Sequence, residues 1–189
     1  MLGKFFGRKG QSVHRMDLST DAGMLGVWDY ASFSIIHDYD SWDAELCEDV
    51  DIQRHIKAGE FIPLNLGDGA FGVEIRFGSP DSMSEREKKY LLVPGQPYLL
   101  RTKGKVCVSG IEAVSGELRP QAISLDVDPG DYAVLPQLID WNQEPGAVDE
   151  NDAPTANALP DIIVYLAPPI DGGVYRTELE TFRKEDALR

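Results

Sequence analysis

Short segments in which apolar and polar residues alternate recur along most of this chain, and this period of two constrains the fold most. Clear examples are GVEIRFG (72–78), QAISLDV (121–127) and DIIVYLAP (161–168). Glycine, proline and aspartate separate such segments at intervals of about ten residues, which is the turn chemistry that joins short strands. YLLRTKGKVCVSG indicates a hairpin around Lys103 and Gly104. The pattern predicts a mainly β fold, a single antiparallel β-sandwich-like domain.

One segment has the period of a helix instead. Residues 42–58 carry apolar side chains at helical spacing, Leu46 and Val50 among them, and acids in the first turn, where they suit the helix dipole. Ser41 is the candidate N-cap, and Gly59 stands where a helix would stop. We therefore predict one main α-helix over 42–58.

Two further segments, one before and one after the predicted helix, have clear patterns. VWDYASFSIIHDY (27–39) is aromatic and β-branched on both faces, which predicts a central strand that leads into the helix. SMSEREKKYLL (82–92) predicts a second, shorter helix, capped by Ser82 or Ser84, that gives way to a strand.

The length of 189 residues suits one domain with ragged ends. Residues 1–24 contain four glycines and no sustained period, and we expect a basic arm that is mobile or docks late. Residues 25–189 are expected to form the single β-sandwich-like domain. Within it, residues 143–160 contain three prolines and almost no periodicity, which predicts an excursion over the surface.

The chain is strongly acidic, with 18 Lys and Arg against 32 Asp and Glu and a net charge of −14. Such a field repels phosphate backbones and anionic lipid headgroups and attracts basic surfaces. We therefore expect no direct contact with nucleic acid or membrane and expect a basic protein partner. The plainer interpretation, that the acidity only keeps the protein in solution, remains open.

Targeting and cysteine content indicate a cytoplasmic protein. No apolar run is long enough for a membrane span, and the N-terminus has no apolar region typical of a secretory signal. Cys47 and Cys107 are too few for a disulfide framework, and their apolar neighbours predict two small buried side chains.

The densest acidic stretch is HDYDSWDAELCEDVD (37–51), with seven carboxylates and no Lys or Arg. Placed on an EF-hand loop that starts at Asp38, it has Trp42 at position 5, Asp43 at position 6 and Leu46 at position 9, so the ligand pattern fails. A calcium site of another type remains an alternative. Its ligands would be Asp38, Asp40, Asp126 and Asp128.

Catalytic patterns are also missing from the sequence. There is no GxSxG elbow, no HExxH pair and no Cys with a His nearby in sequence, and GDGAFG (67–72) precedes a strand rather than a helix. We therefore predict no catalytic residue and no cofactor, and expect that the protein is not an enzyme.

Recognition of a partner is the interpretation that remains for the acidic stretch. A helix face of carboxylates beside a loop with Tyr39 and Trp42 combines long-range attraction with aromatic anchors, as in interfaces with basic proteins. The alternative is a solvated helix face with Trp42 packed in the core. The predicted contact residues are Asp38, Asp40, Trp42, Asp43, Glu45, Glu48 and Asp49.

Four motifs add a family resemblance: SFSIIHDYDSW (32–42), IKAG (56–59), NLGDGAFGVEIRF (65–77) and DPGDYAV (128–134). In order and character they resemble the bacterial competence-associated DNA-entry nuclease inhibitors, which are small acidic proteins. That family has an acidic Trp-containing helix ending in a Lys-Gly pair and a late PxGDY strand. Here Ala58 separates Lys57 from Gly59, and the PGDY motif lacks the intervening residue. The resemblance spans roughly residues 28–135.

The resemblance implies an acidic, non-catalytic inhibitor or immunity-type protein that covers the active site of a basic partner, such as a nuclease or a toxin. Two other classes remain open. One is a metal-dependent or carbohydrate-active β-sandwich, and the other is a subunit of a bacterial or phage assembly tethered by residues 1–24. The sequence does not determine the oligomeric state.

Overall fold

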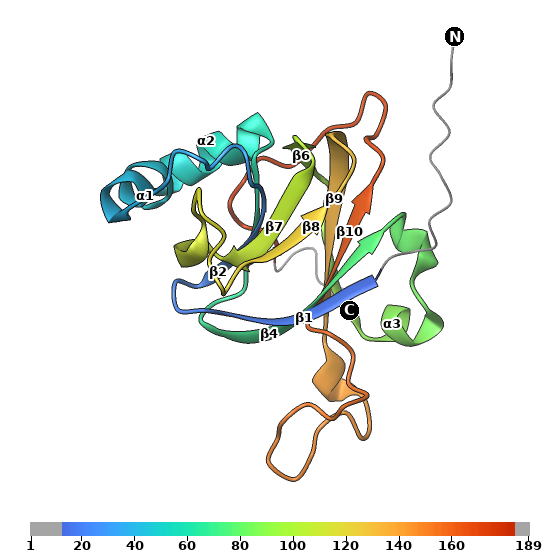
Figure 1. Ribbon diagram of the computed structural model, residues 1–189. Helices are drawn as coiled ribbons and strands as arrows, with labels where there is room; N and C mark the ends of the chain where they lie inside the picture. Colours follow the sequence, from blue (N-terminus) through green and yellow to red (C-terminus); the bar gives the residue numbers. More distant parts are fainter. Residues whose placement is uncertain (1–12, 184–189) are drawn as a thin grey trace.

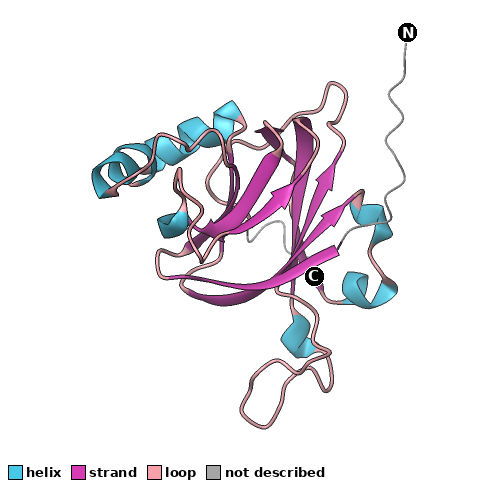
Figure 2. Ribbon diagram, viewed as in Figure 1, coloured by secondary structure: helices cyan, strands magenta, loops and turns pink. Residues whose placement is uncertain are grey.

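The computed structural model describes residues 13–183. In that range ten strands form two open sheets, with helices at their margins (Figures 1 and 2), so the predicted mainly β fold is confirmed. The larger sheet has the order β1 (Val13–Thr20), β4 (Gly69–Phe77), β10 (Ile162–Ala167), β9 (Gly130–Ile139) and β5 (Leu91–Pro94), and β6 (Tyr98–Thr102) also pairs with β9. The smaller sheet has the order β3 (Phe61–Asn65), β2 (Met24–Asp29), β7 (Lys105–Gly110) and β8 (Ile123–Asp126).

The two sheets share one apolar core. Val27 and Val108 from the smaller sheet and Val73 and Val164 from the larger one are fully buried in the same cluster. Pairing between strands is antiparallel except for β10, which runs parallel to β4. This departs from the all-antiparallel expectation, because a long connection separates these two strands in sequence and lets β10 run in the same direction as β4.

The predicted hairpin around Lys103 and Gly104 is a corner between the sheets. β6 pairs with β9, whereas β7 pairs with β2 and β8, so the two neighbouring strands belong to different sheets. Buried Asp29, at the end of β2, fastens this corner by accepting hydrogen bonds from the Thr102 hydroxyl at 2.8 Å and the Lys103 amide at 2.9 Å. A local turn signal identifies the corner but not the partners of its strands.

The predicted long helix is two helices, α1 (Tyr39–Leu46) and α2 (Asp49–Ala58). Glu48 between them has an extended backbone, with φ −96° and ψ 141°, and occupies the N-cap position of α2 without a side-chain cap hydrogen bond. Because the break changes the helical register, Val50, predicted to lie on the apolar edge, is 71% exposed. The helix does end at Gly59, which adopts the left-handed conformation at φ +77°.

The strand before α1 is shorter than predicted. β2 ends at Asp29, and residues 30–35 form turns that return Phe33 and Ile36 to the core. β2 is nevertheless central, between β3 and β7. The third helix, α3 (Glu85–Lys89), is capped by Ser84 as predicted, with Ser84 and Glu87 forming a capping box.

Two peripheral segments were also predicted. Residues 13–20 of the expected arm form β1, which pairs along its length with β4, and residues 1–12 lie outside the described part of the chain. Residues 143–160 contain no strand and form a loop that leaves the body of the molecule (orange in Figure 1). Arg86 of α3 holds this loop through the Glu144 carboxylate and the Asn157 carbonyl, each at 2.6 Å.

Two smaller expectations have different outcomes. Cys107 is buried as predicted, but Cys47 is exposed, because it ends α1 on the solvent side. No helix within residues 13–183 is long and apolar enough to cross a membrane.

Candidate protein-interaction surface

The start of α1 is fixed by a reciprocal capping box. The Asp38 carboxylate accepts the Ser41 amide at 2.8 Å, and the Ser41 hydroxyl lies within 3.1 Å of the Asp38 amide. Asp38 is therefore the N-cap, three residues before the predicted Ser41. Hydrogen bonds from the Ser41 side chain and backbone lower the pKa of Asp38, which keeps this exposed carboxylate charged.

Trp42 packs its ring against the core and remains half exposed. Its indole N–H donates to the Ile111 carbonyl at 2.9 Å, which ties α1 to the short turn η2 (Ile111–Ala113), beneath α1 in Figure 1. Tyr39 stacks on Trp42 with ring centroids 6.2 Å apart and is 71% exposed. The aromatic pair thus has one anchored member and one that faces solvent.

The carboxylates around this pair differ in their surroundings. Asp40, Glu48 and Asp49 are exposed, and no hydrogen bond or ion pair involves their side chains within residues 13–183. Asp43 is half exposed and raises the pKa of the Tyr39 hydroxyl by its negative charge. We call this region the acidic aromatic surface. It consists of Asp38, Tyr39, Asp40, Trp42, Asp43, Glu48 and Asp49.

Glu45, also in the predicted contact set, points inward. Its carboxylate lies 2.9 Å from both Arg54 Nη2 and His55 Nε2, and the other ring nitrogen of His55 lies 2.7 Å from Glu60. Burial raises the pKa of Glu45, but hydrogen bonds from Arg54 and His55 outweigh this effect and lower it. Glu45 therefore connects α1 to α2 and helps to hold the two helices that carry the acidic aromatic surface in place.

Sequence reasoning missed a hollow next to the aromatic pair. It has a volume of about 270 Å³ and is lined by Asp38, Tyr39, Trp42, Glu112 and Arg119. Glu112 and Arg119 come from the segment after β7, about 70 residues beyond Trp42 in sequence. Nothing in the local sequence around Glu112 indicates that it faces α1.

The carboxylates of the metal alternative do not gather into a site. Between residues 13 and 183, no group of three or more His, Cys, Asp or Glu side chains could hold a metal ion. Within that range, Asp38 and Asp40 therefore form no such group with Asp126 or Asp128.

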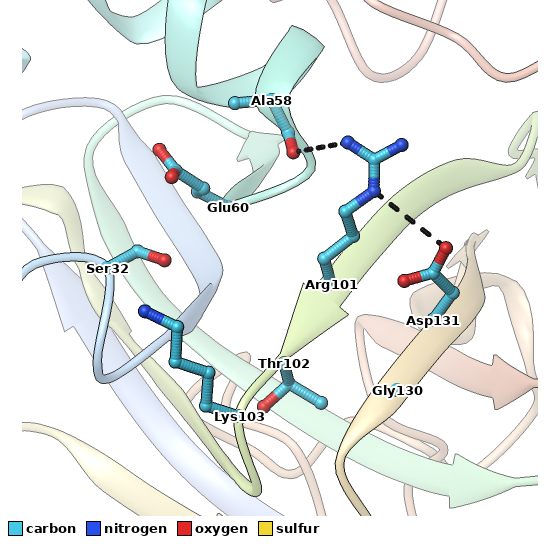
Figure 3. Close-up of a pocket in the computed structure, with 8 residues that line it drawn as sticks. All are labelled: Ser32, Ala58, Glu60, Arg101, Thr102, Lys103, Gly130 and Asp131. Carbon is cyan, nitrogen blue, oxygen red and sulfur yellow. Dashed lines mark hydrogen bonds and ion pairs between the residues drawn. The ribbon is translucent and has the colours of Figure 1, made fainter.

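A second hollow, of about 260 Å³, lies at the end of α2 (Figure 3). Its most prominent cation, Arg101, donates to the Ala58 carbonyl at 3.1 Å and lies 3.8 Å from the Asp131 carboxylate. The guanidinium thus compensates the carbonyl end of α2 and a neighbouring acid. Because the charges of Arg101 and Asp131 already compensate each other within the chain, this hollow is less suited to a charged ligand than the hollow beside Trp42.

Comparison with known proteins shows the fold. No family model and no curated protein matches the sequence. A solved structure described as "Crocagin biosynthetic gene J" is 19% identical and has a TM-score of 0.59, over 84% of this chain and 98% of that chain. The structure of ComJ, inhibitor of the DNA-degrading activity of NucA from Bacillus subtilis, is 11% identical over the same shares, with a TM-score of 0.48.

ComJ is a nuclease inhibitor, and it matches the family that the sequence motifs resemble. At these identities the similarity is one of fold. The two neighbours differ in their described roles, so the residues of the acidic aromatic surface must support any function on their own.

Proposed function

We propose that this chain is an acidic, non-catalytic binding protein that engages a basic protein partner through the acidic aromatic surface. The observation that carries the proposal is the exposed Tyr39 ring stacked on the anchored Trp42 among uncompensated carboxylates. Large aromatic side chains supply contact area at little entropic cost, and surrounding charge raises the rate of encounter with an oppositely charged protein.

The partner we propose is an enzyme or toxin that itself binds an anionic substrate, so that the chain acts as an inhibitor or immunity-type protein. A nuclease is the natural example, because carboxylates placed over its basic active site occupy the position of phosphates. The motif resemblance supports this choice of partner class. The net charge of −14 supports it as well.

The state of the two cysteines favours a binding role over nucleophilic catalysis. Burial raises the pKa of the Cys107 thiol to about 12, and a hydrogen bond with Asp43 raises the pKa of Cys47, so neither thiol is activated as a nucleophile. Both cysteines are free, which supports the cytoplasm as the compartment.

The proposal is tested by affinity capture from a lysate of the source organism. The first bait carries Asp40→Asn, Glu48→Gln and Asp49→Asn, three exposed residues of the surface that form neither a side-chain cap nor an ion pair with other described residues. The control bait carries a second set of three exposed acids neutralised, with the same change in net charge: Asp126→Asn, Asp128→Asn and Glu150→Gln.

We expect the wild type and the control bait to recover the same basic protein and the surface bait to lose it. Recovery should also fall with salt, because encounter between opposite charges is screened. Equal recovery by the surface bait and the control bait would remove this surface as the binding site.

A further inference from the structure

We propose that the hollow beside Trp42 receives an arginine side chain of the basic partner. This inference rests on the proposed function and names the chemistry of its central contact. The hollow combines a pair of stacked aromatic rings, Tyr39 and Trp42, with two carboxylates, Asp38 and Glu112. Aromatic faces attract a guanidinium, and paired carboxylates accept its parallel N–H groups.

The aromatic wall is built in advance. The hydrogen bond from the Trp42 indole to the Ile111 carbonyl holds that ring in place, and the ring also packs against the core. Tyr39 stacks on it at an interplanar angle of 29°, and both rings line the hollow. A planar guanidinium stacks on an aromatic face better than a tetrahedral ammonium does.

Glu112 is exposed, yet other groups hold its carboxylate in place. One oxygen accepts the Thr20 hydroxyl at 2.9 Å, and the other accepts the Asp21 amide at 3.4 Å. The carboxylate also lies directly over Gly110, where a Cβ atom would come within 2.3 Å of it. Glycine at position 110 therefore leaves the room that this carboxylate occupies.

Asp38, the other carboxylate that lines the hollow, is held by its cap on α1. The Ser41 amide and hydroxyl both contact one carboxylate oxygen, Oδ1. The second oxygen, Oδ2, lies 3.6 Å from Nε2 of the exposed His37, which is too long for a hydrogen bond, so Oδ2 can accept one from another donor. Two carboxylates on separate elements, each held by hydrogen bonds, are a preorganised acceptor pair.

The cationic side chain of Arg119, which also lines the hollow, provides a further test of the proposal. It is exposed, and it forms no ion pair with any other residue in the range 13–183. A guanidinium already on the rim competes with, and repels, an incoming one. Removing Arg119 should therefore strengthen binding of a cation and would weaken binding of an anion.

The test uses the full chain and the probe N-acetyl-L-arginine amide, followed by the NMR signal of the Trp42 indole N–H. Trp42→Phe identifies this signal among those of the three tryptophans. We expect a saturable shift with a Kd of roughly 1–10 mM, the range for one ion pair with one aromatic contact. N-acetyl-L-citrulline amide, which has the same shape and no charge, should bind at least about tenfold more weakly.

Two variants should change the Kd of the arginine probe in opposite directions. Glu112→Gln should raise the Kd about three- to tenfold, and Arg119→Ala should lower it by about twofold or more, because a like charge is removed. Melting temperatures are measured alongside. Arg119→Ala should melt like the wild type, because Arg119 is exposed, whereas Glu112→Gln keeps one acceptor oxygen of two and should melt slightly lower.

The proposal is overturned if the Trp42 signal does not move, if citrulline binds as well as arginine, or if Arg119→Ala weakens binding. Any of these results, together with loss of partner capture by the bait with neutralised Asp40, Glu48 and Asp49, would leave the proposed function standing and remove only the arginine contact. Arginine binding with equal capture by both triple-variant baits would instead remove the proposed function.

Discussion

Two carboxylate-rich regions of this protein do opposite things with the same chemistry. At the junction of β4 and α3, Glu74 and Glu87 are buried and converge on one guanidinium, that of Arg76, at 2.6 Å and 2.5 Å. On the acidic aromatic surface, Asp40, Glu48 and Asp49 are exposed and form no ion pair with a cation in the described range 13–183. The density of acids in sequence does not distinguish these cases. The two cases are distinguished by whether the fold places a cation beside the acids.

The buried cluster also shows how matched charge becomes structural. Burial lowers the pKa of Arg76, but its hydrogen bonds to Glu87 and Glu74 outweigh that effect and raise it, so its charge is fixed. Its third nitrogen donates to the Tyr165 hydroxyl at 3.1 Å. The charge of an acid in such a cluster is compensated within the chain, whereas the charge of an acid on the exposed surface is available to a partner.

The largest expected effect comes from breaking the buried cluster. Arg76→Met leaves two buried carboxylates uncompensated and should lower the free energy of unfolding by about 3–5 kcal/mol. Urea denaturation measures it. The matched control is Lys88→Met, which removes an exposed cation paired with Glu85 and should change little. If the two variants were equally stable, the contrast between buried and exposed charge would be wrong.

A smaller effect is expected at Glu45, the acid that faces inward from the surface helices. Glu45→Gln weakens its bonds to Arg54 and His55 and should cost about 1–3 kcal/mol at neutral pH. Its exposed neighbour Glu48 is the control, since Glu48→Gln removes no cap hydrogen bond.

The pH dependence of this difference has a definite sign. Because the pKa of Glu45 is lowered in the folded protein from its usual 4.5, its contribution is present above that value and is lost as the pH falls through the folded pKa. The gap in unfolding free energy between wild type and Glu45→Gln should therefore begin to narrow as the pH falls below 4.5, and should close once the pH is below the lowered pKa of Glu45 in the folded protein. A gap that widened in acid would contradict this role.

The N-cap of α1 should show a still smaller effect. Asp38→Ala removes the acceptor for the Ser41 amide and should lower the melting temperature, whereas Asp38→Asn keeps an acceptor oxygen and should lower it less. Differential scanning calorimetry of the two variants compares them. Equal melting temperatures for Asp38→Ala and wild type would show that the capping box is dispensable.

The smallest effect on stability is expected from neutralising the open surface. Asp40→Asn, Glu48→Gln and Asp49→Asn together lose some interaction with the helix dipoles and relieve some mutual repulsion, so the net change should stay below about 1 kcal/mol. Urea denaturation beside Arg76→Met gives the direct comparison. A loss as large as that of Arg76→Met would mean that these acids serve the fold.

Local patterns were sufficient to locate most elements of this fold. Alternation found β4, β8 and β10, and the Ser84 cap and the stop at Gly59 lie where their chemistry predicts. Pairing was not predictable in the same way. The turn at Lys103 and Gly104 resembles a hairpin, but strand partners depend on contacts distant in sequence, such as those that Asp29 makes with the corner.

The candidate site was predictable in part for the same reason. Tyr39, Trp42 and the acids of α1 lie in one sequence stretch, so their composition indicated a surface. The break at Glu48 was missed because its acids suit both the continuation of one helix and the start of another. Glu112 was missed because its place beside Trp42 depends on the sheet that carries η2 past α1.

The central claim is that the open carboxylates and the Tyr39 ring serve a basic partner rather than the fold. The most direct measurement is the association rate constant of the captured partner, at two salt concentrations, with wild type, the surface triple variant and the Asp126, Asp128 and Glu150 control. We expect the surface variant to associate more slowly, by about tenfold at low salt, and to lose most of the salt dependence, while the control resembles wild type. Identical rates for the surface variant and the control would contradict the claim.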